Sequence, residues 1–352
     1  MKTESILVQT LCVPCGCRCR YCLLSWDGTA VGADWEQSTR FAQQFRQWLR
    51  KNRPELRFHF AFGYAMEHPD LRNALRFLRQ IGSPQAEFLQ CDGMRMRSRA
   101  ECQTLAQMLA EEGVQTLNFT FYGLPDYHDR FANRRGDFAF LLRLMRAADE
   151  AGLAVRAGVP LTAESAGQAD ALLELLRRQV PCLSLSLFVP HEEGRGLSLQ
   201  GIRFSENDLG QLSQEAQALL NRKLYRPERE WLASRDFPEE TGRMLILSLR
   251  RDNIQRYLSM SHEQILTEVE ALDDAYYASF PSLPALAERY GDMHGGRFYR
   301  QRDLFSHYRR LYAAEYGVSV YDVTDERQSG SIRYLYLRQP NKTAARLRGR
   351  LL

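Results

Sequence analysis

The feature that most constrains the fold is a regular alternation of short apolar runs with amphipathic stretches through the first two thirds of the chain. Each run is four to eight residues of mainly apolar or β-branched character bounded by turn residues, which is typical of buried parallel strands. The runs are Ile6–Leu11, Arg57–Phe62, Ala86–Cys91, Gln115–Phe121, Leu153–Val159 and Leu183–Val189. The alternation predicts an α/β fold with a parallel sheet.

The stretches between these runs repeat their apolar residues every three to four positions, which predicts amphipathic helices. One apolar stripe comprises Phe41, Phe45, Trp48 and Leu49, and further stripes lie at 71–78, 105–109 and 138–145. The expected helix-start pairs are Ser98 with Glu101 and Ser205 with Asp208, and the expected helix-stop glycines are Gly82, Gly113 and Gly152.

Parallel strands joined by helices require right-handed crossovers, and their functional residues gather at the carboxyl ends of the strands. Six units are too few for an eightfold barrel, so a partial barrel and a doubly wound sheet both fit at this point. After about residue 225 the alternation is lost. The sequence then predicts helices at Met244–Tyr257, His262–Phe280, Leu283–Tyr290 and Asp303–Tyr316, and a strand at Ser331–Leu337. We therefore expect a core at 1–225 and a mostly helical C-terminal region at 226–352.

Composition sets the broad class of protein. Of 352 residues, 44% are hydrophobic and 26% are charged, which is normal for a globular protein and argues against disorder. No apolar run is long enough to span a bilayer, and no export signal opens the chain, so we expect a cytoplasmic protein with reduced thiols. The net charge of +4 argues against nucleic acid as a partner, and the basic tail (Lys342, Arg346, Arg348 and Arg350) is expected to be a frayed end.

Five of the eight cysteines fall between residues 12 and 22, directly after the first predicted strand. Cys15, Cys19 and Cys22 have the spacing C-x3-C-x2-C. Three such thiolates in one loop can each bind one iron of a cubane cluster and leave the fourth iron without a protein ligand. An open coordination position is what a reactive metal site needs.

Two other metal sites compete with this interpretation. The pairs Cys12-x2-Cys15 and Cys19-x2-Cys22 also suit a four-cysteine zinc site, and then a zinc-stabilised binding or regulatory protein. Only three residues separate the pairs, whereas zinc ribbons need a longer excursion. A closed ferredoxin-like cluster requires a remote fourth cysteine followed by proline. Under the open-cluster interpretation, Cys12 and Cys17 are spare thiols.

The cysteine loop, with Tyr21 immediately before its last cysteine, resembles that of the radical S-adenosylmethionine (SAM) superfamily. The resemblance covers roughly residues 4 to 225 and implies a partial (β/α)6 barrel with a [4Fe-4S] cluster on Cys15, Cys19 and Cys22, whose free iron is chelated by SAM. Weaker matches follow in order at the later strand ends. They are FGYAMEHPDL at 62–71, CDGM at 91–94, FYGLPDYHDRF at 121–131 with GDF at 136–138, and VP at 189–190.

The resemblance also implies which residues contact SAM, and it assigns no catalytic side chain. These residues are Tyr21, Gly63, Tyr64, Asp92, Arg156 and Val189. Each position has a structural interpretation too. On that interpretation, Gly63 and Gly93 are ordinary turn glycines, Asp92 caps a turn and Arg156 is an ion in the core. Of the histidines in the family matches, His68 and His128 would then be structural loop residues.

In the superfamily, the reduced cluster cleaves SAM to a 5′-deoxyadenosyl radical that abstracts hydrogen from a substrate. This implies an oxygen-sensitive enzyme that depends on a reducing flavodoxin or ferredoxin. Because no cysteine follows Cys182, no cysteine-ligated auxiliary cluster is expected in the C-terminal region, and the early first strand argues against a preceding cobalamin or leader-peptide domain. The 122–138 passage resembles the peptide-modifying and cofactor-maturing branch, so we expect a peptide substrate, with a small metabolite as the alternative. A protein that binds SAM without cleaving it is a further alternative.

Overall fold

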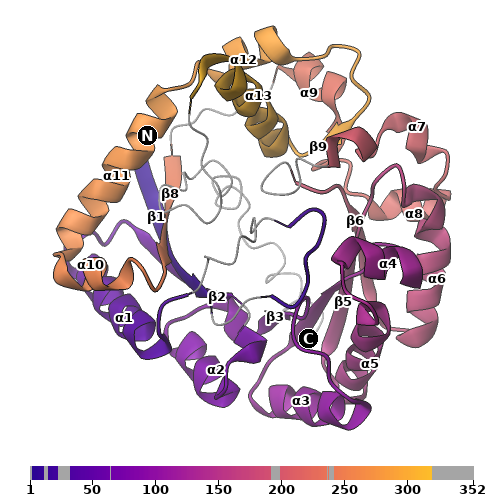
Figure 1. Cartoon of the computed structure of the whole chain (residues 1–352), viewed down its shortest axis with the longest axis horizontal. Helices are drawn as coiled ribbons and strands as arrows, with labels where there is room; N and C mark the ends of the chain where they lie inside the picture. Colours follow the sequence, from indigo (N-terminus) through magenta and orange to yellow (C-terminus); the bar gives the residue numbers. More distant parts are fainter. Residues whose placement is uncertain are drawn as a thin grey trace.

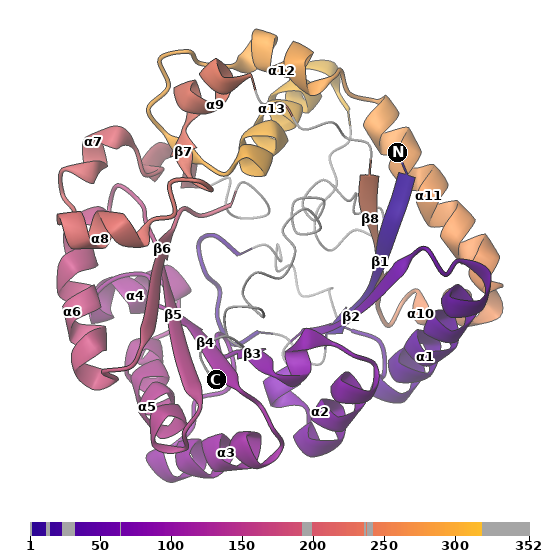
Figure 2. The ribbon, with the colours of Figure 1, turned by 180° about the vertical axis from the view of Figure 1, so that it is seen from behind.

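The strands line the inner side of an open arc and the helices cover its outer side (Figure 1, Figure 2). This computed structural model describes residues 2–11, 15–22, 32–63, 65–191, 199–235, 237 and 242–318. The predicted α/β class is therefore confirmed. Two parallel sheets form the arc, with the strand orders β2-β1-β8 and β3-β4-β5-β6.

The six predicted strands are all present, with ends that differ from the expected ones by a few residues. They are β1 (Lys2–Leu11), β2 (Arg57–Gly63), β3 (Phe88–Gln90), β4 (Thr116–Thr120), β5 (Ala154–Pro160) and β6 (Ser184–Phe188). The described chain also contains β7 (Arg226–Pro227), β8 (Gly242–Leu249) and β9 (Phe298–Tyr299). The short strands β7 and β9 form an antiparallel pair of their own.

Successive side chains of a strand point alternately to the helices and to the inside of the arc. Val8 lies beside Phe60 of β2 and Leu247 of β8, and all three are buried in the main core. The next residue of β1, Gln9, points to the opposite face, where its side-chain amide donates to Ser248 Oγ at 2.6 Å. The period-2 alternation of a strand thus separates an apolar outer face from a partly polar inner face.

The capping pairs and stop glycines that the sequence predicts lie at helix ends. Ser98 and Glu101 form a capping box, as do Ser205 and Asp208. Gly82, Gly113 and Gly152 follow helix ends with φ angles of 73°, 76° and 77°. The α-helices are α1 (Trp35–Asn52), α2 (Leu71–Gln80), α3 (Arg99–Glu111), α4 (Pro125–Ala132), α5 (Asp137–Glu150), α6 (Ala169–Gln179), α7 (Glu206–Leu209), α8 (Gln214–Leu219), α9 (Glu228–Ser234), α10 (Ile254–Ser259), α11 (His262–Ala278), α12 (Leu283–Tyr290) and α13 (Gln301–Tyr316). The 3₁₀ turns include η1 (Ala65–Glu67), η2 (Pro84–Ala86) and η3 (Ala166–Gln168).

The predicted helix at Met244–Tyr257 is wrong. Residues 242–249 form β8, which pairs in parallel with β1, and only Ile254–Ser259 is helical. All eight residues of β8 are buried. A short, continuous apolar run has the same pattern in a buried strand and in a buried helix, so periodicity cannot distinguish them. The sheet therefore takes a strand from beyond residue 225, where a mostly helical region was expected.

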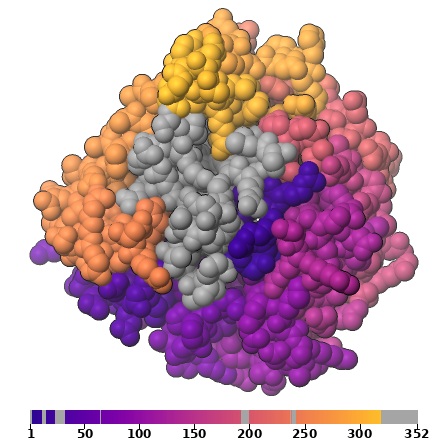
Figure 3. All heavy atoms as spheres, viewed as in Figure 1, coloured from indigo at the N-terminus to yellow at the C-terminus, as the bar shows by residue number. Residues whose placement is uncertain are grey.

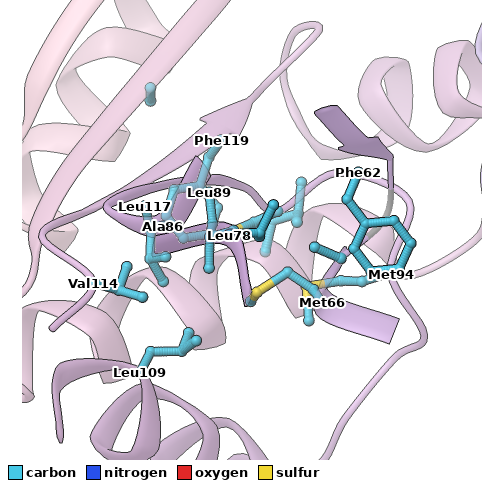
Figure 4. Close-up of a cluster of buried hydrophobic side chains, with 14 of the residues drawn as sticks. Phe62, Met66, Leu78, Ala86, Leu89, Met94, Leu109, Val114, Leu117 and Phe119 are labelled. Atoms are coloured by element: carbon cyan, nitrogen blue, oxygen red, sulfur yellow. The ribbon is translucent and has the colours of Figure 1, made fainter. Parts of the chain in front are cut away.

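The main core lies between the sheets and the surrounding helices. Figure 4 shows part of it, where Leu78 of α2 and Leu109 of α3 point toward Leu89 of β3 and Leu117 of β4. These four side chains are at most 3% exposed. Full burial of one such side chain contributes about 1.5–3 kcal/mol.

The C-terminal helices predicted at His262–Phe280, Leu283–Tyr290 and Asp303–Tyr316 are confirmed as α11, α12 and α13. A smaller core forms among α9, α12, β9 and α13. The predicted strand at Ser331–Leu337 and the basic tail lie outside the described residues. Within the part of the chain that the structure describes, no helix is both long enough and apolar enough to cross a bilayer.

Candidate metal centre

Backbone N–H groups of the cysteine loop at 15–22 donate to carbonyls elsewhere in the chain and hold the loop in place. The Gly16 N–H donates to Gly93 O at 2.6 Å, the Arg18 N–H to Ala132 O at 2.8 Å, and the Arg20 N–H to Phe131 O at 3.0 Å. Alternate residues of the loop are thus fixed by main-chain bonds. The loop lies against α4 in Figure 1 and Figure 2, and Figure 3 shows indigo atoms of the N-terminal chain on this face.

The partners of this loop come from the end of a helix. Phe131 and Ala132 are the last two residues of α4, and the final carbonyls of a helix have no partner within the helix. Asn133 ends α4 in the left-handed conformation, with φ 51°. The cysteine loop satisfies the two carbonyls that this ending leaves unpaired. Local sequence around residue 133 therefore helps to position a loop more than 100 residues away in the chain.

Gly93, in the turn after β3, permits close contact between the turn and Cys15. It has φ +74°, a conformation that other residues adopt at a cost. A Cβ atom added there would lie 1.9 Å from Cys15 Sγ. The turn-glycine interpretation of Gly93 is therefore correct, and the same glycine also borders the candidate metal centre.

Hydrogen bonds reach the candidate ligand thiols of Cys19 and Cys15. The Tyr122 hydroxyl donates to Cys19 Sγ at 3.1 Å, and the Cys17 backbone N–H donates to Cys15 Sγ at 3.4 Å. Cys19 is buried, whereas Cys15 and Cys22 are partly exposed. Hydrogen bonds to sulfur stabilise thiolate, which is the form that binds metal.

The Cys17 thiol interacts with the thiols of Cys15 and Cys19 and also with two charged side chains near the start of α5. It is buried, and its Sγ lies 3.7 Å from Asp137 Oδ2 and 3.9 Å from Arg134 Nη1. A thiol that donates to a carboxylate has its proton committed to that contact. Cys12, the other predicted spare thiol, lies outside the described residues.

Below the loop, a buried polar network joins α4 to α5. His128 is fully buried, and its Nδ1 accepts from the Tyr122 backbone N–H at 3.2 Å. Its other nitrogen, Nε2, therefore carries the proton and donates to Asp137 Oδ2 at 3.1 Å. Arg134 donates to Asp137 Oδ1 at 3.2 Å and to Met94 O at 2.6 Å. His128 thus has the structural role that its isolated position in the sequence suggested.

Asp129 completes this network by capping α5. Its carboxylate accepts from the backbone N–H groups of Gly136 at 2.5 Å and Phe138 at 3.0 Å. Gly136 itself offers no side chain to cap the helix. The described contacts of the 122–138 passage therefore hold the cysteine loop and order α5.

We expect Asp129→Ala to lower the free energy of unfolding by about 1–2 kcal/mol, because two amides at the start of α5 lose their acceptor. Chemical denaturation of the apoprotein measures this. Asp126→Ala is the matched control, since Asp126 is an exposed acid at the other end of α4. Equal losses in the two variants would contradict the capping role.

Tyr21 packs into an aromatic group beside the cysteines. Its ring centroid lies 5.5 Å from that of Tyr122, 5.8 Å from that of Phe131 and 5.2 Å from that of His191. Burial and the nearby acidic groups raise the pKa of Tyr21. The residue before the last cysteine therefore remains a neutral phenol against one side of the loop.

The other predicted cofactor residues lie at different positions along their strands. Gly63 ends β2 beside Leu11, Asp92 follows β3, and Val189 follows β6, so all three lie at the carboxyl ends of strands. Tyr64 lies outside the described residues. Arg156 is the third residue of β5, and its guanidinium lies over the ring of Phe88, the first residue of β3, at 5.7 Å. Arg156 therefore starts nearer the amino ends of the strands than the other three.

Asp92 links the turn after β3 to β4. Its carboxylate accepts from the Thr120 N–H at 2.9 Å and from the Thr120 hydroxyl at 2.6 Å, and Gln90 donates to it as well. Burial raises the pKa of Asp92 to about 6, against the lowering effect of these donors. The Asp92 carboxylate thus links the turn after β3 to Thr120 of β4, which is a different role from capping its own turn.

A single metal ion and a cubane cluster require different arrangements of ligands. Among the described residues, no three His, Cys, Asp or Glu side chains converge closely enough to hold a single ion. A cubane cluster instead needs each thiolate to reach a different iron, and three cysteines spaced along one docked loop provide such a set. The donor set of Cys15, Cys19 and Cys22 therefore fits an iron–sulfur cluster.

The sequence did not assign Tyr122, Arg134 and Asp137 to this centre, although they surround it. All three fall within or beside the 121–138 passage that was noted as a family match. The available signal was a polar passage directly after a strand end, where parallel strands place functional residues. Their contacts with a loop at residues 15–22 depend on tertiary structure.

Neither family models nor curated proteins match this chain. Similar solved structures include Streptococcus suis SuiB bound to S-adenosylmethionine, which is 13% identical, with 74% of this chain and 54% of that chain covered and a TM-score of 0.45. SuiB bound to its precursor peptide SuiA is 12% identical, with 74% of this chain and 62% of that chain covered and a TM-score of 0.46. Coproporphyrinogen III oxidase from Escherichia coli, a radical SAM enzyme, is 17% identical, with 64% of this chain and 54% of that chain covered and a TM-score of 0.40. The chain thus spans between half and two thirds of these structures, and at these values the likenesses do not establish an activity for it.

Proposed function

We propose that this chain is a radical SAM enzyme that holds a [4Fe-4S] cluster on Cys15, Cys19 and Cys22. One observation supports this most directly. The loop at the carboxyl end of β1, which carries the C-x3-C-x2-C cysteines, is docked by main-chain hydrogen bonds of Gly16, Arg18 and Arg20. When bound, the cluster would supply one electron for reductive cleavage of SAM.

The protein's own residues would position this chemistry. In the proposal, Tyr21, Gly63, Tyr64, Asp92, Arg156 and Val189 contact SAM. Gly63, Asp92 and Val189 all lie at the carboxyl ends of strands, the edge at which parallel α/β sheets bind ligands. The substrate would lie across the same edge, since a short-lived radical has to form within reach of its target. The reductant would be a flavodoxin or ferredoxin, and the substrate a peptide, with a small metabolite as the alternative.

The test is anaerobic reconstitution with iron and sulfide, followed by SAM and dithionite. We expect wild type to bind about four irons and to form 5′-deoxyadenosine, and the Cys15→Ala/Cys19→Ala/Cys22→Ala variant to lose both. Loss of product should reach the detection limit, because removing three of three ligands leaves no site.

Cys17→Ser is the matched control, since Cys17 lies in the same loop but outside the C-x3-C-x2-C set. It should retain the cluster and deoxyadenosine formation. A zinc-loaded wild type without deoxyadenosine formation would overturn the proposal in favour of a zinc-site protein. An iron–sulfur protein that binds SAM without cleaving it would show the cluster but no deoxyadenosine.

A further inference from the structure

Tyr122 is a buried phenol whose hydroxyl is directed at a candidate cluster ligand. It follows β4 and is 4% exposed, and its hydroxyl donates to Cys19 Sγ at 3.1 Å. Cys19 is also buried. In such a site, water does not compete for the sulfur, so a single hydrogen bond has a larger electrostatic effect than at the surface.

The ring of Tyr122 is fixed on several sides. It stacks on His128 at 5.0 Å and on Phe131 at 4.6 Å between centroids, and Tyr21 meets it edge-on at 5.5 Å. The Tyr122 backbone N–H is tied to His128 Nδ1. His128 is in turn held by Asp137. The ring that carries the hydroxyl is therefore held by α4 and by Tyr21 of the cysteine loop, with the hydroxyl directed at Cys19.

We infer that Tyr122 is a positioning residue that raises the reduction potential of the cluster through its hydrogen bond to Cys19. The inference rests on the proposed function, because it requires the cluster. One-electron reduction adds negative charge, part of which lies on the ligand sulfurs. A donor on one of these sulfurs stabilises the reduced form more than the oxidised form, and such hydrogen bonds are a recognised control on iron–sulfur potentials.

The direct test is a redox titration of the reconstituted cluster, in which the EPR signal of the reduced form is measured at each applied potential. Tyr122→Phe keeps the ring and removes only the hydroxyl. We expect the ratio of reduced to oxidised cluster at a fixed applied potential to fall about tenfold, which is a shift of about 59 mV toward more negative potential for one electron.

Tyr127→Phe is the matched control. Tyr127 lies on α4 beside the same loop, but its hydroxyl contacts Thr162 at 3.2 Å and Glu164 at 3.1 Å, not a cysteine. Its potential should equal that of wild type. An unchanged potential in Tyr122→Phe, or an equal shift in Tyr127→Phe, would overturn the inference.

A second variant covers the case in which Tyr122→Phe does not hold the cluster. Fluorotyrosine at position 122 keeps the hydroxyl and makes it a stronger donor, so the potential should move in the opposite direction, toward less negative values. No shift in that loaded variant would also overturn the inference. Failure of wild type to bind an iron–sulfur cluster would instead contradict the proposed function, so the two failures are distinguishable.

Discussion

Replacing Gly93 by alanine is expected to displace the cysteine loop and sharply reduce iron binding. Two costs combine at this position. The φ of +74° costs about 1–2 kcal/mol for a residue with a Cβ, and the new Cβ would lie 1.9 Å from Cys15 Sγ. Either the turn after β3 or Cys15 has to move, and overpacking of this kind costs a further ~1–3 kcal/mol. Anaerobic reconstitution with iron analysis, together with denaturation of the apoprotein, measures both effects.

Gly152→Ala is a close control for this prediction. Gly152 has φ +77°, but a Cβ there would meet nothing within 4 Å. It should therefore show only the backbone cost, with normal iron content. If Gly93→Ala matched Gly152→Ala in both iron content and stability, the close approach between Gly93 and Cys15 would not matter for the site.

Replacing Arg243 by methionine is expected to cost about 3–5 kcal/mol of unfolding free energy, the usual effect of removing one partner from a buried ion pair. Arg243 of β8 is 3% exposed and donates to Asp273 Oδ2 at 3.0 Å, where the Asp273 side chain is 2% exposed. It also contacts Asp274 at 2.5 Å, and its Nε donates to Thr3 Oγ1 of β1 at 3.1 Å. The guanidinium thus joins β8 to both β1 and α11.

The control is an exposed ion pair on the same chain. Arg289→Met breaks a pair with Glu315 in which both side chains are nearly half exposed, and such pairs contribute about 0–1 kcal/mol. Denaturant midpoints of the apoproteins compare the two. In the double variant Arg243→Met/Asp273→Leu, part of the loss should return, because no carboxylate then remains buried without its cation at that position. An Arg243→Met variant as stable as Arg289→Met would contradict this account of how β8 is anchored.

Local pattern was enough to predict most of the secondary structure. The strands β1 to β6 and the helices with clear stripes were predicted because the apolar face of each element repeats with its own period. Capping chemistry worked for the same reason, since the Ser98–Glu101 pair acts within four residues. β8 was missed because its buried run has no polar alternation, and only the free edge of β1 makes it a strand.

The site divides in the same way. The spacing of Cys15, Cys19 and Cys22 is a property of one short segment, so the sequence alone identifies three candidate ligands. The same spacing leaves Cys17 out of the ligand set, but its contacts with Asp137 and Arg134 form only in the folded chain. Likewise, Tyr122 was part of a recognised passage, but only the folded chain directs its hydroxyl to Cys19.

The sequence by itself determined the α/β class, the positions of the first six strands along the chain, several helix ends and the thiols offered to a metal. Each of these depends on interactions within about a dozen residues, such as side-chain periodicity, capping and turn geometry. Tertiary structure alone decided that residues 242–249 become a strand beside β1, that the last carbonyls of α4 fix the cysteine loop, and which buried groups face each sulfur. The physical reason is that these outcomes satisfy unpaired backbone and side-chain groups far apart in the chain, and such groups find their partners only when the elements pack together.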